Sequence, residues 1–291
     1  IENKAEVNKC RNDGVGPLYM SARGGYPAVL ELLIKNKAEV NQCTQDGKNP
    51  LCIASEHRNL DVLKLLIENN AKINWGNEAF TNIFLNICRE GKTEMVKFLI
   101  ENKADVNRAY RNGVTPLFVS AEAGNFEIAQ LLINNKAEIK CRTTDGVGPL
   151  FMSAQAGHLK VVKLLIENKA EVNKATKIGG VTPLLQSSFK GHLDVVKSLI
   201  ENKAEVNLGS NDGRTPLIMS SKKGHLAVVK LLISKNAKIN QPTEFGAAAL
   251  IATCQEGHLE VIQLLIKNKA KVNQAKEDGQ TPLFMSSKHG H

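Results

Sequence analysis

Four histidines recur at nearly constant spacing along this chain of 291 residues, and each follows a glycine. They are His158, His192, His225 and His258. Imidazole is a common zinc ligand, so such a ladder raises metal binding as a first hypothesis. If the spacing reflects stacked helices, neighbouring rings lie about 8–10 Å apart, whereas Zn–N bonds are close to 2 Å. We therefore assign the histidines to turns and predict no metal and no cofactor.

Serines recur in the same phase, which raises nucleophilic catalysis as a second hypothesis. The column consists of Ser21, Ser120, Ser153, Ser187, Ser220 and Ser286. A catalytic serine is a single residue activated by an adjacent base, not a column. The chain also has no glycine-rich phosphate loop and no H-E-x-x-H motif. We interpret the serines as packing residues and predict that the chain is not an enzyme.

The cysteines and apolar stretches indicate the class of protein. Six cysteines are scattered with no C-x-x-C pair, which is typical of reduced thiols. The apolar stretches are far shorter than the roughly 20 residues of a membrane-spanning helix, and the first residues show no signal-peptide pattern. We expect a soluble protein without a membrane span, located in the cytoplasm, with the nucleus left open.

A period of 33 residues organises these columns. Proline precedes leucine at Pro17, Pro50, Pro116, Pro149, Pro183, Pro216 and Pro282, and successive differences are 33, 66, 33, 34, 33 and 66. Ile83 and Ala249 stand where prolines are missing. The chain therefore reads as a single array: the tail of a preceding repeat at 1–10, eight full repeats and a partial ninth at 276–291. The full repeats are 11–43, 44–76, 77–109, 110–142, 143–175, 176–209, 210–242 and 243–275.

Each repeat predicts two short helices. An Asp-Gly turn precedes a proline at the first helical position, and the residue before that proline is in nearly every repeat a Thr, Asn or Gly, all acceptable N-caps. A glycine ends this helix, and a second helix follows, as at 158–168, where apolar residues share one face and charged residues the other. Helices this short are marginal alone, so neighbouring repeats must stack. We predict an all-α solenoid.

The combination of Thr-Pro-Leu, Gly-His-Leu and Ala-Glu-Val-Asn resembles the ankyrin repeat over essentially the whole chain; Thr215-Pro216-Leu217 with Gly224-His225-Leu226 is a near-complete copy. The resemblance implies paired antiparallel helices with β-hairpin or turn fingers, and a concave surface made by fingers and first helices. It also implies protein–protein interaction.

The sequence departs from the family pattern in three respects. Apolar residues replace the usual histidine after Pro-Leu, so packing between repeats is expected to be apolar there. Lysine replaces the usual glycine after the second helix, and we expect the preceding asparagines, Asn36, Asn102, Asn168 and Asn202, to adopt the left-handed conformation instead. No polar terminal repeat is visible, so we expect a monomeric array within a longer chain.

The formal charge of +9 raises nucleic acid as a partner. Seven lysines, however, lie in one column at the ends of second helices, where a cation complements the helix dipole. Basic residues of the fingers and first-helix ends alternate with glutamates. The pattern disfavours nucleic acid and favours another protein as the partner.

Positions that vary between repeats while the frame is constant are candidates for partner binding. They lie at finger tips and first-helix ends and comprise Arg11, Arg23, Lys48, Trp75, Glu78, Phe80, Arg89, Tyr110, Arg111, Phe189, Lys190, Arg214, Lys222 and Lys223. Trp, Tyr and Arg commonly anchor interfaces, so one hypothesis centres a hot spot on Trp75, Phe80 and Tyr110. The alternative is that Trp75 and Phe80 fill space left by the missing turn of the irregular repeat 77–109. The irregular repeat 243–275, which contains Phe245, is a bend or a second contact region.

Two functions remain open at this point. The chain is either a scaffold or adaptor that binds a macromolecule on its concave face, or a substrate-recognition or autoinhibitory segment of a larger enzyme or channel.

Overall fold

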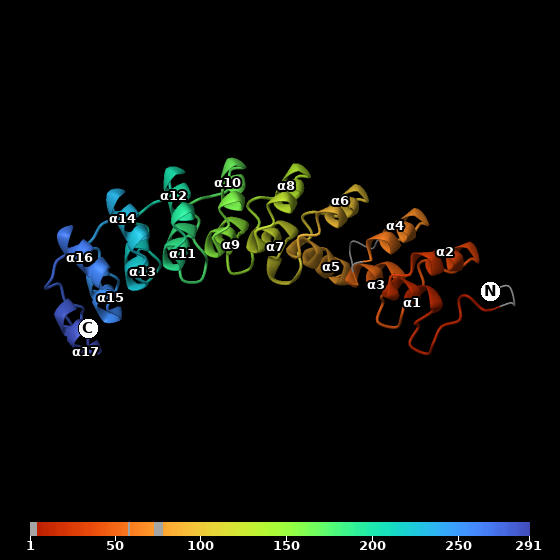
Figure 1. Cartoon of the computed structure of the whole chain (residues 1–291), viewed down its shortest axis with the longest axis horizontal. Coiled ribbons are helices and arrows are strands. Elements are labelled where there is room, and N and C mark those ends of the chain that lie inside the picture. Colours follow the sequence, from red (N-terminus) through yellow and green to blue (C-terminus); the bar gives the residue numbers. More distant parts are fainter. Residues whose placement is uncertain (1–4, 58, 73–77) are drawn as a thin grey trace. The chain divides into compact units, whose positions relative to one another are not determined.

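The computed structural model describes residues 5–57, 59–72 and 78–291, and these residues form seventeen α-helices, one 3-10 helix and no β-strand (Figure 1). The all-α prediction is confirmed, and the fingers are turns. Contacts divide the chain into two compact units, Ile1–Tyr110 and Arg111–His291. The second unit begins one residue after the predicted start of the fourth full repeat.

The first unit contains helices α1–α6. Their bounds are α1 Pro17–Gly24, α2 Pro27–Lys35, α3 Pro50–Glu56, α4 Leu60–Glu68, α5 Glu78–Arg89 and α6 Thr93–Glu101. Helices α1, α3 and α5 pack side by side as first helices of their repeats, and α2 packs against α4 as a second helix.

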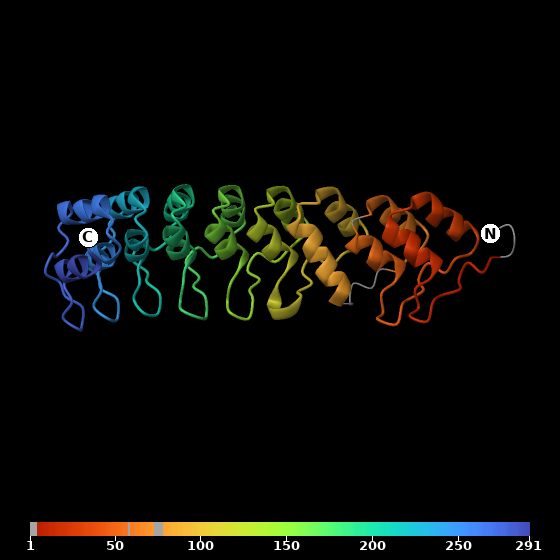
Figure 2. The same ribbon diagram turned by 60° about the horizontal axis from the view of Figure 1, so that its bottom comes forward.

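The second unit contains the 3-10 helix η1 and helices α7–α17. Their bounds are η1 Arg111–Gly113, α7 Pro116–Ala123, α8 Phe126–Asn134, α9 Pro149–Ala156, α10 Leu159–Glu167, α11 Pro183–Lys190, α12 Leu193–Glu201, α13 Pro216–Lys222, α14 Leu226–Ser234, α15 Ala249–Glu256, α16 Leu259–Lys267 and α17 Pro282–His289. Within this unit the odd-numbered helices form one row and the even-numbered helices a second row. The loops before α9, α11, α13, α15 and α17 project to the same side as fingers (Figure 2).

The predicted helix boundaries are present. The Thr215 hydroxyl accepts a hydrogen bond from the Ile218 amide (3.2 Å), and Pro216 occupies the first turn of α13. The same threonine cap begins α7, α11 and α17, and an asparagine begins α3. Glycines with φ between 70° and 82° follow α1, α7, α9, α11, α15 and α17. Each first helix is thus limited to about two turns by local chemistry.

Second helices bury one face against their neighbours. In α10, Val161, Val162 and Leu165 are fully buried, whereas Lys160 and Lys163 are exposed. This agrees with the amphipathic pattern. In the column that replaces the usual histidine, Tyr19 and Phe151 are half-buried and Phe284 is exposed. The other six members are buried, namely Cys52, Leu85, Phe118, Leu185, Ile218 and Ile251.

The expectation that asparagines adopt the left-handed conformation is wrong. Asn168 has φ −90°, whereas Lys169 has φ 68°. The lysines Lys37, Lys103, Lys136, Lys169, Lys203 and Lys269 all have φ between 66° and 68°.

The following alanine sets this register. The Ala170 amide donates to the Leu165 carbonyl (3.0 Å), and this bond requires left-handed backbone at the residue before the alanine. Where an asparagine precedes the alanine, as at Asn70 and Asn236, the asparagine has positive φ. Asn168 instead donates from Nδ2 to the Leu164 carbonyl (2.9 Å) and thereby satisfies an open carbonyl at the helix end.

Histidines connect successive repeats of the second unit. Nε2 of His192 lies 3.0 Å from the Gln155 carbonyl oxygen of the preceding repeat, and His158, His225 and His258 make equivalent contacts at 3.0–3.1 Å. The ring also lies over Gly157, where an added Cβ would stand 2.8 Å from it. Asn59 makes the corresponding bond in the first unit, to the Ala22 carbonyl (2.9 Å).

A second column, of asparagines, connects repeats at the end of the second helix. Asn173 donates to the Lys203 carbonyl (3.0 Å) and accepts from the Glu205 amide (2.8 Å). Asn8, Asn41, Asn207 and Asn240 make the same pair of bonds with the next repeat. We call this pair the asparagine clamp.

One repeat replaces the clamp with an ion pair. Lys140 occupies the asparagine position, and Arg142 instead reaches Glu171 of the next repeat (Nη2–Oε2 2.7 Å). Arg142 holds the pKa of Glu171 below its usual value.

Candidate functional site

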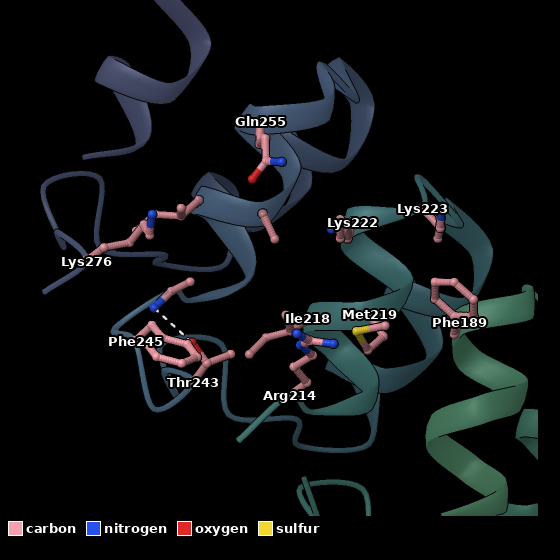
Figure 3. Close-up of a pocket in the computed structure, with 13 residues that line it drawn as sticks. Phe189, Arg214, Ile218, Met219, Lys222, Lys223, Thr243, Phe245, Gln255 and Lys276 are labelled. Carbon is pink, nitrogen blue, oxygen red and sulfur yellow. Dashed lines mark hydrogen bonds between the residues drawn. The ribbon is translucent and has the colours of Figure 1, made fainter. Parts of the chain in front are cut away.

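A groove in the second unit lies between the fingers and the first helices of the repeats 176–209, 210–242 and 243–275 (Figure 3). Its volume is about 490 Å³. The lining residues are Phe189, Arg214, Ile218, Met219, Lys222, Lys223, Thr243, Phe245, Ala247, Ile251, Ala252, Gln255 and Lys276. Phe189, Lys222 and Lys223 lie at one end, and Thr243 and Phe245 at the other.

Two small residues account for the groove. Ala247 stands at the repeat position that Arg214 occupies one repeat earlier, and Ala252 at the position of Met219. The missing side chains leave space above α15, whose buried Ile251 contributes to the floor. The irregular sequence of repeat 243–275 therefore coincides with a cavity, which supports the hypothesis of a second contact region.

An exposed aromatic ring borders this space. Phe245 occupies the finger-tip position where the previous repeat has Asp212, and it is 60% exposed. The Thr243 hydroxyl accepts from the Ala247 amide (3.1 Å), and the Thr243 amide donates to the Ala247 carbonyl (3.0 Å). The short turn thus holds Phe245 at the groove mouth.

Cations surround the other end. The ammonium groups of Lys223 and Lys190 lie 5.1 Å and 5.7 Å from the centroid of the Phe189 ring. Such cation–π contacts contribute about 0.5–1 kcal/mol at exposed sites. Among the described residues, neither lysine has a carboxylate within 4.0 Å.

The remaining cations of the groove are each paired with a carboxylate. The ion pairs are Arg214–Asp212 at 2.8 Å, Lys222–Glu256 at 3.9 Å and Lys276–Asp278 at 3.2 Å. The Gln280 amide and, to a smaller extent, the Lys276 ammonium donate to Asp278 and hold its pKa below the usual value. The rim is therefore basic, with its excess charge concentrated at Lys190 and Lys223.

A smaller depression of about 360 Å³ adjoins the groove on the side of α11. Phe189, Arg214 and Met219 line both depressions. Five residues predicted from the sequence, Phe189, Lys190, Arg214, Lys222 and Lys223, are brought together in this area.

The residues predicted to form a hot spot around the irregular repeat 77–109 have different outcomes in the structure. Trp75 lies outside the described residues. Helix α5 begins at Glu78 and so replaces the turn and the start of the usual first helix with one continuous helix. Phe80 is only 2% exposed, which supports the alternative that it fills space in the core. Tyr110 is half-buried.

The other predicted binding residues lie apart from the groove. Arg11 pairs with Asp13 (3.1 Å), and Lys48 pairs with Glu56 (2.9 Å), which raises the pKa of Lys48. Arg23 is exposed at the end of α1. Arg89 donates to Asn86 (3.1 Å) at the end of α5, and Arg111 is exposed in η1.

The serines that raised the hypothesis of nucleophilic catalysis have hydrogen-bond partners in their own helices. The buried hydroxyls of Ser120, Ser153 and Ser220 donate to carbonyls of their own helices. Burial raises the pKa of Cys52 to about 11, so only a small fraction of this thiol is the reactive thiolate near neutral pH. Over residues 5–57, 59–72 and 78–291, no group of three or more His, Cys, Asp or Glu side chains could hold a metal ion.

A family model that describes three copies of the ankyrin repeat matches this chain at residues 1–77, 84–176, 150–243 and 239–291. The chain belongs to the ankyrin-repeat family. Ankyrin repeats generally mediate protein–protein interaction and are typically not catalytic. The match is interrupted at 78–83, where α5 replaces the ankyrin turn.

Solved structures agree with this ankyrin fold. One that matches is the crystal structure of the human ASB11 ankyrin repeat domain, with a TM-score of 0.66 and 23% sequence identity, covering 70% of this chain and 90% of that one. No curated protein matches significantly. In the part of the chain that the structure describes, no helix has the length and apolar character needed to cross a membrane.

Sequence reasoning missed part of the ankyrin groove. Ile218 and Ile251 belong to the apolar column that is expected to pack between repeats, and the predicted binding residues do not include Ala252, Gln255 or Lys276. The signal was present as small residues in a column where the neighbouring repeats carry larger ones. To recognise this signal in the sequence, one must know that finger residues and first-helix residues of adjacent repeats face the same space.

Proposed function

We propose that this ankyrin array is a scaffold or adaptor that binds another protein on the surface formed by its fingers and first helices, and that it acts in the cytoplasm. The observation that carries the proposal is the groove of the second unit. Its lining differs from repeat to repeat, whereas the asparagine clamps of Asn207 and Asn240 and the buried alanines Ala204, Ala237 and Ala270 recur around it.

The chemistry of the groove supports a protein partner. Aromatic residues and arginine are enriched at protein interfaces, and Phe189, Phe245 and Arg214 line this groove. A half-open apolar floor with a polar rim also resembles the anatomy of such interfaces.

Affinity capture from extracts of the native cell tests the proposal. The immobilised chain is compared with a variant that carries Phe245→Ala and Lys223→Glu, both before and after nuclease treatment. We expect proteins that bind the unaltered chain, resist nuclease and are depleted on the variant. Retention of nucleic acid alone, or identical retention by both chains, would contradict the proposal.

A further inference from the structure

The apolar part of the groove lacks an occupant among the described side chains. This part is lined by Ala252, Ile218, Ile251 and Phe245, within a groove whose whole volume is about 490 Å³. Clefts that bind ligands in proteins commonly have volumes of about 300–1,000 Å³. A large apolar side chain that entered this space would remove both its own surface and part of the exposed Phe245 ring from water.

The two lysines beside Phe189 are not explained by helix capping. A cation near a helix C-terminus is favourable in general, but the position of Lys190 and Lys223 is occupied by Ala123, Ala156, Glu256 and His289 in the other repeats of the unit. Lysine at this position of the unit is therefore confined to the repeats 176–209 and 210–242, which form one end of the groove. A carboxylate bound there would form charge-assisted hydrogen bonds, which are about twice as strong as neutral ones.

The arrangement fits isolated carboxylates better than a phosphate chain. Asp212, Glu256 and Asp278 lie along the same rim, and a continuous nucleic-acid backbone would pass close to them. Nucleic-acid binding depends on neutralising successive phosphates, and the like charges of these carboxylates oppose it.

We propose that this groove binds an acidic segment of a partner protein, with one large apolar side chain above Ala252 and carboxylates at Lys190 and Lys223. The inference rests on the proposed protein-binding function and specifies its site and its ligand class.

The test uses a displayed library of random linear peptides selected on the whole chain. We expect the selected peptides to combine a large apolar residue with Asp or Glu. Their affinity is then measured by fluorescence anisotropy at low and high salt, with single-stranded DNA as a competitor.

Three variants separate the contributions. Ala252→Met restores the side chain that the preceding repeat carries and should weaken binding at least about tenfold at both salt concentrations. The double variant Lys190→Glu and Lys223→Glu should weaken it at least about tenfold at low salt and less at high salt, because screening reduces the loss. Lys230→Glu, an exposed position on α14, makes the same change of charge as each groove substitution and should alter affinity less than about twofold.

Circular dichroism and denaturant midpoints verify that each variant folds. If Ala252→Met does not, Ala247→Arg fills the same space with the residue of the preceding repeat. Selected peptides that bind the filled variants as well as the original chain would overturn the groove inference but leave the protein-binding function intact. Peptides without acidic residues, or their displacement by DNA, would also overturn the inference. Failure to select any peptide, together with failure to capture any protein, would contradict both the groove inference and the proposed protein-binding function.

Discussion

The left-handed lysines offer a sensitive test of the forces that end the second helices. Lys169 has φ 68°, its side chain is exposed, and Ala170 closes the helix through its bond to Leu165. Replacement by glycine would keep both the backbone path and that bond. The substitution Lys169→Gly therefore changes only backbone strain, chain entropy and one charge.

The three effects can be compared. Left-handed backbone costs a non-glycine L-residue roughly 1–2 kcal/mol. The greater freedom of glycine in the unfolded chain removes about 0.5–1 kcal/mol of the gain. The net stabilisation is then about 0–1.5 kcal/mol. Lysine at a helix C-terminus, however, contributes about 0.3–1 kcal/mol at low ionic strength. We expect the substitution to be nearly neutral at low salt and stabilising at 1 M salt, where the Debye length falls to about 3 Å.

The assay is urea unfolding of the whole chain, followed by circular dichroism at both salt concentrations. The matched control is Lys235→Gly, because Lys235 occupies the helix C-cap with φ −103° and the following Asn236 is the left-handed residue. The control loses the same charge without relief of strain, so it should be destabilising or neutral. The substitution Lys169→Asn should also keep the left-handed backbone, because Asn236 adopts it at the same position of its own repeat.

One result would refute this reasoning. If Lys169→Gly and Lys235→Gly shift the midpoint equally at 1 M salt, the left-handed backbone of the lysine carries no measurable cost. A change in the m-value would show instead that the unfolding of the repeats had become less concerted, and the fitted free energies would then be replaced by repeat-resolved hydrogen exchange.

Further predictions concern a histidine, two thiols and an ion pair. His192→Ala leaves the Gln155 carbonyl without its partner and should destabilise the chain by about 1–3 kcal/mol in urea unfolding, whereas His192→Asn should lose less because another repeat makes the bond with asparagine. Exposed Cys43 should react with a thiol reagent at pH 8 while buried Cys52, with a pKa of about 11, reacts only on unfolding; equal rates would contradict this. Arg142 lowers the pKa of Glu171. The ion pair between them should therefore stabilise the chain above pH 4.5 and lose that effect as the pH falls through the lower folded-state pKa of Glu171. Glu171→Gln should thus reduce stability by less than about 1 kcal/mol at pH 7, and the difference should disappear in acid.

The repeat frame could be predicted because its signals are local. Thr215 and Pro216 begin a helix by their own hydrogen-bonding chemistry, and Gly191 ends one by its backbone freedom. These signals recur in phase, so an irregular copy can be recognised against the others. The frame was therefore readable from the sequence alone.

Other features depend on contacts that the local sequence does not contain. Propensity favours asparagine over lysine in left-handed backbone, but the docking of Ala170 determines which residue takes that conformation. The groove arises from side chains that are small at Ala247 and Ala252, and its volume depends on which fingers face them. The early start of α5 at Glu78 similarly follows from tertiary packing of Phe80 and Phe84.

The asparagine clamp has a consequence for how the array comes apart. Asn173 binds only backbone of the next repeat, at Lys203 and Glu205, so each clamp couples nearest neighbours and nothing farther away. Disruption of the array then advances as a front from one repeat to the next, and it pauses or starts where the coupling changes. The repeat with Lys140 is such a place, because it has a solvent-screened ion pair in place of the two hydrogen bonds between an asparagine side chain and the next backbone. Under mechanical load applied to the second unit, we expect the first step of extension to occur there.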